Sequence, residues 1–352
     1  MMIMNDIFYV SVIIPCRNEE KYISRVLDSI LNQTYPQTNI EIFLIDGDSD
    51  DLTKNKVIEY CVKNRNIKLI INKKRTVPYA LNIGIKNAQG NIIIILGAHA
   101  EYPSNYISTL VYYIGKLHAD NVGASTITVP ADNKPVSRAI AISMSSIFGV
   151  GNATFRLENI TGKEFIEVDT VPFGCYRREV FERIGLFDEQ LTRNQDNEFN
   201  ERLRNAGGKI YLIPSLKIKY FARENYSKLY KMFFQYGYFG PLVDLKLKKP
   251  TQLRRYIPTV FVLSLIIPLL LSLLFYPFLY LWVFTVSLYF IASATFATYE
   301  CRKRDSIHLI PYVMWAYFVS HVSYGLGYLK GVFDFMILKN HLKSKVDVEL
   351  SR

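Results

Sequence analysis

Charged side chains follow two short apolar segments near the start of the chain. Residues 46–51 read Asp-Gly-Asp-Ser-Asp-Asp directly after one apolar run, and Arg75 follows the next. A carboxylate in this position can accept hydrogen bonds from a base N–H or a ribose hydroxyl, and an arginine can bind a phosphate. In a plainer interpretation, Asp51 or a neighbour caps the next helix and Arg75 is a solvated loop residue. Both can hold together, with Asp46 contacting a ligand and Asp51 capping.

A further carboxylate, Asp196, lies in the sequence Asn194-Gln195-Asp196. A carboxylate placed beside a reacting hydroxyl can take its proton as a general base. The alternative is that Asp196 caps the helix expected after it. Spacing alone does not decide between these two roles.

The elements that must position these groups alternate regularly over the first hundred residues. The pattern predicts strands at 9–15, 40–45, 67–71 and 91–96, and helices at 18–32, 51–64 and 77–88. Such alternation is typical of βαβ units with a buried parallel sheet. Ligands of these sheets bind beyond the carboxyl ends of the strands, which is where the charged groups fall. The second half is less regular, with strands expected at 121–129, 167–177 and 209–213 and helices at 136–148 and 196–205.

The C-terminal third contains two long apolar segments. Residues 256–299 and 306–329 include no Asp, Glu, Lys or Arg, and a membrane-spanning helix needs about 20 apolar residues. We therefore expect transmembrane helices at about 256–275, 278–299 and 306–329. The expected domains are an α/β domain at 1–225, an interfacial amphipathic and basic linker at 226–255, a membrane segment at 256–335 and a polar tail at 336–352. The alternative for the helix near Tyr226 is a surface helix packed on the domain.

The chain carries a net charge of +11, from 42 basic and 31 acidic residues. Basic residues are densest at Lys246, Lys248, Lys249, Arg254 and Arg255, immediately before the first apolar segment. This placement favours anchoring beside anionic lipid over binding to nucleic acid. It predicts a multi-pass protein of the cell membrane with its N-terminal domain in the cytoplasm, where the four cysteines stay reduced. A third span would place the basic tail outside, against the positive-inside tendency.

Five sequence motifs occur in a fixed order between residues 9 and 245. They are VSVIIPCRNEEKYI, LIDGDSDDLT, NKKRTVPYALNIGIKNAQGNIII, AHAEYPSNYI and FGCYRREVFERIGLFDEQLTRNQDNEFNERLRNAGGKIYLIP. Together they resemble family 2 glycosyltransferases of GT-A fold, and most closely the ExoA-like branch of succinoglycan biosynthesis. The resemblance implies an α/β nucleotide-sugar-binding domain with a mainly parallel sheet, followed by the C-terminal transmembrane helices.

The resemblance also implies roles for individual residues. Nucleotide-sugar binding is implied for Pro15, Arg17, Asn18, Glu19, Asp46, Asp48 and Arg75. Asp196 matches the general base that deprotonates the acceptor hydroxyl, although Gln195 replaces the family's neighbouring Glu. The acceptor region is implied for Gln195, Arg204, Gln235, Tyr236 and Gly237.

The expected metal site departs from the family's pattern. The family has Asp-x-Asp or Asp-Ala-His after the fourth strand, whereas here Gly97 replaces the first Asp and His99 follows. Mg²⁺ prefers oxygen ligands, and Mn²⁺ tolerates a histidine better. Three interpretations remain: a weak Mn²⁺ or Mg²⁺ site that uses His99 and the donor's diphosphate, rescue by Glu101, or metal-independent catalysis with Arg75 supplying charge. A Gly97→Asp substitution is expected to leave the fold unharmed.

The function expected from these features is sugar transfer at the cytoplasmic face of a membrane. The donor would be a nucleotide-diphosphate sugar, with a UDP-sugar favoured, and the acceptor a polyprenyl-linked saccharide of polysaccharide biosynthesis. The enzyme would invert the configuration of the sugar. The alternatives are a catalytically impaired sugar-binding or assembly subunit and a polysaccharide synthase. Deleting 256–352 is expected to leave a folded domain that binds nucleotide.

Overall fold

The structure, a computed structural model, describes residues 8–151, 153–157, 162–250 and 255–340. Two compact units divide the chain. Unit 1 comprises Met1–Ile127 and Asn159–Tyr220, and unit 2 comprises Thr128–Glu158 and Phe221–Arg352. These boundaries differ from the expected domain limits at 225, 255 and 335, because apolar residues from the segment 128–158 pack with those of the C-terminal helices.

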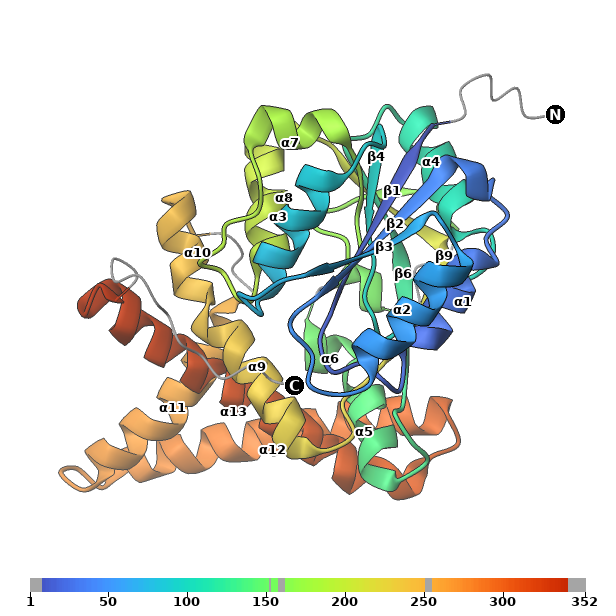
Figure 1. Ribbon diagram of the computed structural model, residues 1–352. Helices are drawn as coiled ribbons and strands as arrows, with labels where there is room; N and C mark the ends of the chain where they lie inside the picture. The colour runs from blue at the N-terminus through green and yellow to red at the C-terminus, as the bar shows by residue number, and fades with distance from the viewer. Residues whose placement is uncertain (1–7, 152, 158–161, 251–254, 341–352) are drawn as a thin grey trace. The chain divides into compact units, whose positions relative to one another are not determined.

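Four parallel strands form one half of the sheet in unit 1 (Figure 1). Strand β1 (Val10–Cys16) lies between β2 (Ile40–Asp46) and β4 (Ile92–Ile95), and β3 (Ile67–Ile71) pairs with the far side of β2. Every residue of β2 is buried, as is typical of a parallel strand covered on both faces. The parallel register brings the carboxyl ends of these strands, and the loops that follow them, to one edge of the sheet.

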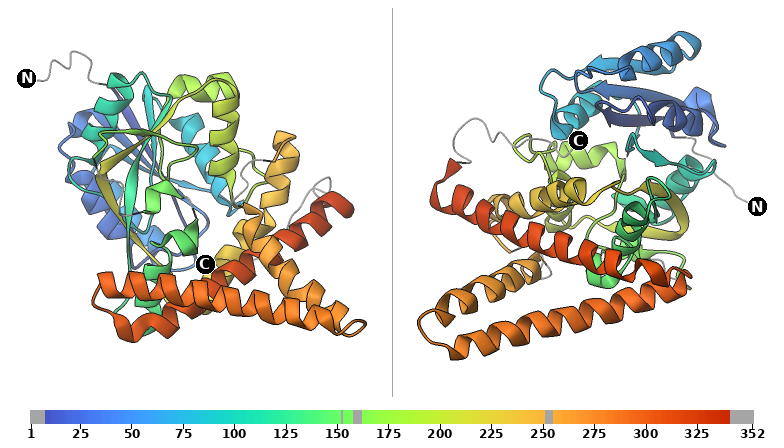
Figure 2. Two further views of the ribbon diagram at one scale, coloured as in Figure 1. Left: turned by 180° about the vertical axis from the view of Figure 1, so that it is seen from behind. Right: turned by 90° about the horizontal axis from the view of Figure 1, so that it is seen from below.

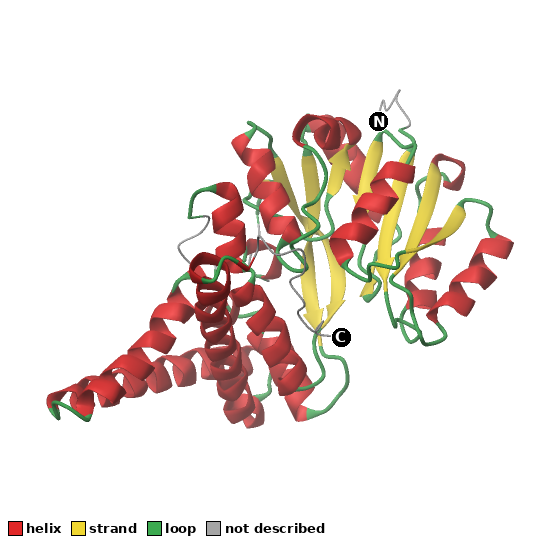
Figure 3. Ribbon diagram, turned by 60° about the vertical axis from the view of Figure 1, so that its left-hand side comes forward, coloured by secondary structure: helices red, strands yellow, loops and turns green. Residues whose placement is uncertain are grey.

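Helices follow the first three of these strands, as the alternating pattern predicts, and a fourth helix, between 96 and 121, was not predicted; helices lie beside the strands in Figure 3. They are α1 (Ile23–Leu31), α2 (Thr53–Lys63), α3 (Val77–Asn87) and α4 (Tyr106–Lys116), with a short 3-10 turn at Gln37–Asn39. The apolar face of α1 is buried, which fixes the helix on the sheet. It begins five residues later than expected, because Asn18 takes a left-handed conformation with φ 55° and the chain forms a loop before Ile23.

The rest of the sheet contains antiparallel pairs. Its members are β5 (Ala100–Glu101), β6 (Asn121–Val129), β7 (Ile166–Glu167), β8 (Cys175–Arg177) and β9 (Ile210–Phe221). In the described part of the chain the order of the sheet is β3-β2-β1-β4-β8-β6-β9-β5, and β7 pairs with β9. The single strand expected at 167–177 is wrong, because Pro172 lacks a backbone N–H and Phe173 has φ 50°. Helices α7 (Arg178–Ile184) and α8 (Gln195–Asn205) complete unit 1.

Unit 2 is helical. It contains α5 (Pro135–Ser143), α6 (Ile147–Val150), α9 (Tyr226–Tyr238), α10 (Gly240–Leu247), α11 (Ile257–Ser272), α12 (Pro277–Lys303) and α13 (Ile310–Gly331). Short 3-10 helices lie at Thr154–Arg156 and Ile307–Leu309, and a π-helix at Val332–Ile337 follows α13. The helix expected at 136–148 is thus two helices. Helices α9 and α13 lie side by side (Figure 2), and the backbones approach so closely that a Cβ at Gly237 would lie 2.0 Å from the carbonyl oxygen of Tyr324. This packing against α13 does not decide between an interfacial helix and a surface helix packed on the domain, so both interpretations of α9 stay open.

The expectation of three transmembrane helices is not confirmed. Among the described residues, only α12 is both long and apolar enough to cross a membrane. Helix α11 has 16 residues, or about 24 Å at 1.5 Å per residue, which is shorter than a hydrocarbon core of about 30 Å. Helix α13 buries small residues, among them Ser320, Ser323 and Gly327, because it packs within unit 2. Arg254 and the tail beyond residue 340 lie outside the described residues.

Candidate active site

The loops after β1 and β2 bind one another at the edge of the sheet in unit 1. The backbone N–H of Asn18 donates to Ser49 Oγ at 2.9 Å, and the Asn18 side-chain oxygen accepts from Asp50 N–H at 3.1 Å. The Glu19 N–H donates to Thr53 Oγ1 at 2.7 Å. Residues that the sequence assigns to nucleotide binding are therefore held together by a reciprocal set of hydrogen bonds between two loops.

Asp46 lies at the end of β2 and is fully buried. Its two carboxylate oxygens accept hydrogen bonds from Ser49, one from the backbone N–H at 3.0 Å and one from the hydroxyl at 2.5 Å. In this structure Asp46 therefore shapes the β2–α2 loop, and its contact with a nucleotide base remains a prediction. Pro15 lies beside it, where β1 pairs with Ile45 of β2.

Asp51 stabilises the start of α2, in agreement with the plainer interpretation of this carboxylate. Its Oδ1 accepts from the N–H of Thr53 at 2.9 Å, and its Oδ2 accepts from the N–H of Glu20 at 3.1 Å. Burial works to raise the pKa of Asp51, but the hydrogen bonds from Thr53 and Glu20 outweigh it and lower that pKa. The carboxylate thereby joins the β1–α1 loop to α2.

Two arginines lie on the loops at this edge. Arg75 Nη2 and Nε contact Asp48 Oδ2 at 2.5 and 3.2 Å, and the hydrogen bonds from Arg75 lower the pKa of the Asp48 carboxyl. Both residues have positive φ, 63° and 57°, so the pair fixes two tight loops. Arg17 follows β1, and its buried Nε has no hydrogen-bond partner among the described residues. The Arg17 side chain packs closely against Gly47, where an added Cβ would lie only 3.2 Å from carbon atoms of Arg17.

The residues of the expected metal site do not fit a divalent ion. His99 Nδ1 lies 3.8 Å from Glu19 Oε1, and the His99 ring meets Tyr220 edge-on. Glu101 is on β5 and forms an ion pair with Lys219 at 3.0 Å. Over the described residues, no group of three His, Cys, Asp or Glu side chains could hold a metal. Rescue by Glu101 is therefore not supported, since its carboxylate is already paired with a cation on β9.

Asp196 lies in the first turn of α8 and is exposed. It follows Asn194, whose left-handed conformation, with φ 62°, turns the chain into the helix. One carboxylate oxygen accepts from the N–H of Asn197 at 2.9 Å, and the positive end of the helix dipole favours its ionised form. The N-cap position of α8 is Asn194, so Asp196 is not the capping residue, and its role as a proton acceptor stays a prediction.

Sequence reasoning missed a buried polar network beneath α8. Asn200 Oδ1 accepts from Asn121 Nδ2 at 3.0 Å and from the Tyr176 hydroxyl at 3.2 Å, and Asn200 Nδ2 donates to Thr170 Oγ1 at 2.8 Å. Asn200 is fully buried and stands one helical turn after Asp196. The only sequence signal for this network was the position of Asn200, four residues after Asp196 in the NQDNEFN motif. The residues that Asn200 contacts are distant in sequence, so the motif could not identify them.

A second contact that the sequence did not reveal fixes the loop before α8. Asn82 on α3 donates to the carbonyl of Phe187 at 2.9 Å and accepts from the Phe187 N–H at 3.0 Å. It also donates to Glu189 at 3.0 Å. Helix α3, which begins two residues after Arg75, is thereby joined to the segment that leads to Asp196.

The residues of the expected acceptor region belong to two helices, α8 and α9, and their binding of an acceptor stays a prediction. Gln195 opens α8, whereas Arg204 stands near its other end, about 14 Å along the axis at 1.5 Å per residue, in an ion pair with Glu201 at 2.9 Å. Gln235, Tyr236 and Gly237 belong to α9 in unit 2. Gln235 is buried and Gly237 is required for the contact with α13. Arg204 is thus separated from Asp196, and Gly237 has a packing role.

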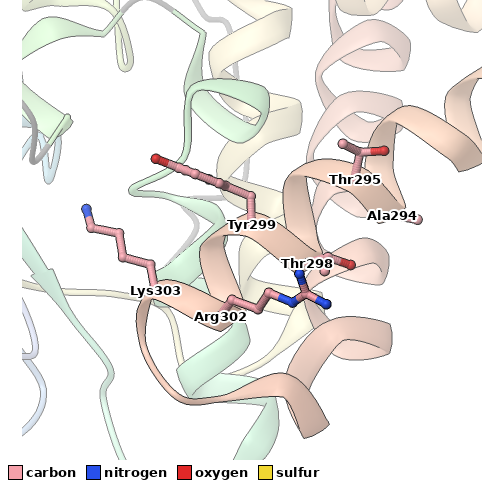
Figure 4. A pocket seen from close by; sticks show the side chains of 6 residues that line it. All are labelled: Ala294, Thr295, Thr298, Tyr299, Arg302 and Lys303. Atoms are coloured by element: carbon pink, nitrogen blue, oxygen red, sulfur yellow. The ribbon is translucent and has the colours of Figure 1, made fainter.

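A surface pocket in unit 2 lies along α12 (Figure 4). All of its lining residues come from one face of the last turns of this helix: Ala294, Thr295, Thr298, Tyr299, Arg302 and Lys303. None of them was assigned to a site from the sequence. The pocket is open and formed by a single helix, so it does not describe the nucleotide site of unit 1.

Comparison with known proteins agrees with the motifs. The family model "Glycosyl transferase family 2" matches residues 11–185. The Methanococcus voltae dolichyl N-acetyl-alpha-D-glucosaminyl phosphate 3-beta-D-2,3-diacetamido-2,3-dideoxy-beta-D-glucuronosyltransferase is 33% identical over 234 residues, covering 65% of this chain and 72% of that protein. The succinoglycan biosynthesis protein ExoA of Rhizobium meliloti is 26% identical over 228 residues, covering 64% and 67%.

Solved structures share the fold. The mannosyltransferase PcManGT from Pyrobaculum calidifontis, in complex with GDP-Man and Mn²⁺, aligns with a TM-score of 0.59 at 17% identity, covering 94% of this chain and 88% of that one. Residues 1–349 of S. aureus TarS, in complex with UDP-GlcNAc, align with a TM-score of 0.51 at 17% identity, covering 97% and 95%. The fold is therefore GT-A, and with the relatives above it establishes that this chain belongs to glycosyltransferase family 2.

Proposed function

We propose that this glycosyltransferase moves a sugar from a nucleotide-diphosphate sugar, a UDP-sugar being favoured, to a lipid-linked saccharide at the cytoplasmic face of the cell membrane. The observation that carries the proposal is the hydrogen-bonded set of loops at the carboxyl ends of β1, β2 and β3. It gathers Arg17, Asn18, Asp48 and Arg75 at the edge where α/β sheets bind nucleotides. Asp196 supplies the exposed carboxylate that the transfer requires.

The reaction we propose is a single displacement. The acceptor hydroxyl attacks the anomeric carbon as the bond from that carbon to the diphosphate oxygen breaks, and the hydroxyl proton passes to Asp196. The transition state resembles an oxocarbenium ion, and the leaving diphosphate gains negative charge. Side-chain cations at the edge of the sheet would stabilise that charge. Attack from the face opposite the leaving group inverts the configuration at this carbon.

A lipid-linked acceptor is supported by two observations. The M. voltae relative is named for a dolichyl-linked phosphate saccharide. In this chain, α11 and α12 leave many large apolar side chains exposed, among them Leu270, Tyr280 and Phe284, and so large an exposed apolar surface marks an interaction or membrane site. We propose that these helices hold the enzyme at the bilayer where a polyprenyl-linked acceptor resides.

The test is to incubate the full chain, in membranes of its expression host and with a polyprenyl diphosphate-linked saccharide, with a panel of radiolabelled UDP- and GDP-sugars. Label recovered in the organic phase, from at least one donor and above membranes lacking the protein, is the expected result. Nucleotide binding without transfer from any donor would contradict the proposal and favour the catalytically silent subunit. That second candidate rests on a specific observation, the replacement of the family's first metal-site carboxylate by Gly97.

A further inference from the structure

Gly97 stands at the end of β4, where its backbone is fixed on both sides. Its N–H is 2.7 Å from the Tyr102 hydroxyl, and that hydroxyl donates to the Gly97 carbonyl at 3.2 Å. The preceding residues are also held, since the N–H of Leu96 donates to Ile13 and that of Ile95 to Gly174. The backbone at position 97 therefore has little room to move away from its neighbours.

An aromatic ring fills the space that a side chain at position 97 would need. A Cβ on Gly97 would lie 2.4 and 2.7 Å from two ring carbons of Phe173, far inside van der Waals contact. The ring is packed edge-on against Tyr102, with centroids 6.1 Å apart, and the backbone carbonyl of Phe173 accepts from the Tyr106 hydroxyl at 3.3 Å. Phe173 and Gly97 are thus complementary, and a carboxylate at 97 is excluded unless the ring moves.

The remaining groups do not replace that carboxylate. His99 Nδ1 lies 3.8 Å from Glu19 Oε1, and over the described residues no group of three His, Cys, Asp or Glu side chains could hold a metal. Mg²⁺ at a nucleotide is usually held by protein carboxylates together with the phosphates, and it prefers oxygen ligands to a histidine. The loops provide two guanidinium groups. Arg17 Nε has no hydrogen-bond partner within the described ranges, whereas Arg75 is paired with Asp48 and would have to share its charge with the diphosphate. Guanidinium groups bind phosphate oxygens strongly without a bridging metal.

We propose that Phe173 takes the place of the family's first metal-binding carboxylate, and that this enzyme binds the diphosphate of its donor without a divalent ion held by the protein. This inference rests on the proposed function, because it concerns the same nucleotide site. It gives Phe173 a role that no motif suggested. It also corrects the expectation that Gly97→Asp leaves the fold unharmed.

Nucleotide binding measured by calorimetry tests the metal part. The full chain in detergent is titrated with UDP and, separately, GDP, in MnCl₂ and in excess EDTA. We expect at least one nucleotide to bind with Kd values that agree within about threefold in the two conditions, well under the tenfold that 1.4 kcal/mol represents. Binding more than about tenfold tighter in Mn²⁺ would overturn this inference alone. Failure of both nucleotides to bind in either condition would overturn the proposed function, and this inference with it.

Thermal unfolding of four proteins tests the steric part: Gly97→Asp, Phe173→Ala, the double variant and the wild type. We expect Gly97→Asp to lower the Tm by several degrees, and Phe173→Ala to recover part of that loss in the double variant. The matched control is Gly115→Asp, because a Cβ at Gly115 meets no described atom within 4 Å. A Gly97→Asp protein as stable as the control, or strictly additive effects in the double variant, would show that the ring does not occupy this space.

Discussion

At the scale of single residues, the account depends on a carboxylate that lies exposed at the start of a helix. Asp196 stands in the first turn of α8, and the sequence located it through the NQDNEFNERLR motif. The sequence did not reveal the environment of Asp46, which is buried and bonded to Ser49. The burial of a residue depends on which elements pack against it, and a local sequence motif does not specify that packing.

Replacing Asp196 with Asn removes the proton acceptor and keeps the size of the side chain. We expect transfer to fall by about 10²–10⁴-fold, the usual range for loss of a general base, while nucleotide affinity stays unchanged. Initial rates of lipid-linked product formation, with calorimetry in parallel, measure both. The control is Asn205→Ala at the other end of α8. Wild-type rates in the Asp196 variant would contradict the assignment.

Asp51 predicts a pH dependence of stability. Its folded-state pKa lies below the ordinary value of an aspartate, so its contribution to stability is fully present above that ordinary value and is lost as the pH falls through the folded-state pKa. The Tm should therefore drop below about pH 4, and an Asp51→Asn variant should be less stable at neutral pH and show a smaller drop. Calorimetric Tm values between pH 6 and pH 3 measure this. Parallel curves for the two proteins would refute it.

At the scale of elements, the sequence predicted the parallel strands well, because buried β-branched runs such as Ile40–Asp46 leave a clear pattern. It failed for 167–177, where Pro172 and the left-handed Phe173 interrupt the ladder. The membrane span predicted at α13 is not confirmed. Residues 306–329 resemble a membrane span by lack of charge, but their small residues pack against α9, as the close approach of Gly327 to the Phe234 carbonyl shows.

The network around Asn200 positions α8, and its loss should affect both stability and turnover. Asn200→Leu leaves the buried groups of Asn121 and Thr170 without their partner, at a cost of about 1–3 kcal/mol for each unsatisfied group. We expect a lower Tm and a lower kcat with an unchanged nucleotide Kd, because the nucleotide loops do not contact Asn200. Urea unfolding and steady-state kinetics measure these values. An equally lowered nucleotide affinity would show that the network supports the whole site instead.

At the scale of the whole molecule, unit 2 is built from two separated parts of the chain. Ala139 and Ile142 of α5 pack with Ala297, Leu309 and Tyr317 near and within the last helices. Deleting 256–352 would therefore expose apolar surface on the parts of unit 2 that remain. We therefore expect the truncated chain to be less soluble and less stable than the full chain. The same packing explains why domain limits drawn from composition along the chain differ from the compact units.

The two apolar helices before α13 suggest how the protein meets the bilayer. We expect α11 and α12 to insert as a hairpin that does not need to cross the whole hydrocarbon core, because α11 is only about 24 Å long. Lys248 and Asp305 should then both lie on the cytoplasmic side, since basic residues flank the hairpin at each end. Single cysteines at these two positions, in a chain whose native cysteines are replaced by Ala, should react with an impermeant maleimide only from the cytoplasmic face of vesicles. Labelling of the two cysteines from opposite faces of the vesicles would show that α11 and α12 do not form a hairpin with both ends on one side of the membrane.

The central claim is direct displacement at the anomeric carbon with Asp196 as the base. Proton NMR of the transferred sugar in the lipid-linked product, compared with the donor identified in the panel assay, tests it most directly. The account predicts inversion, so that an α-linked donor gives a β-linked product. Retention would require a second displacement or an enzyme nucleophile, and a product with the donor's own configuration would contradict the account.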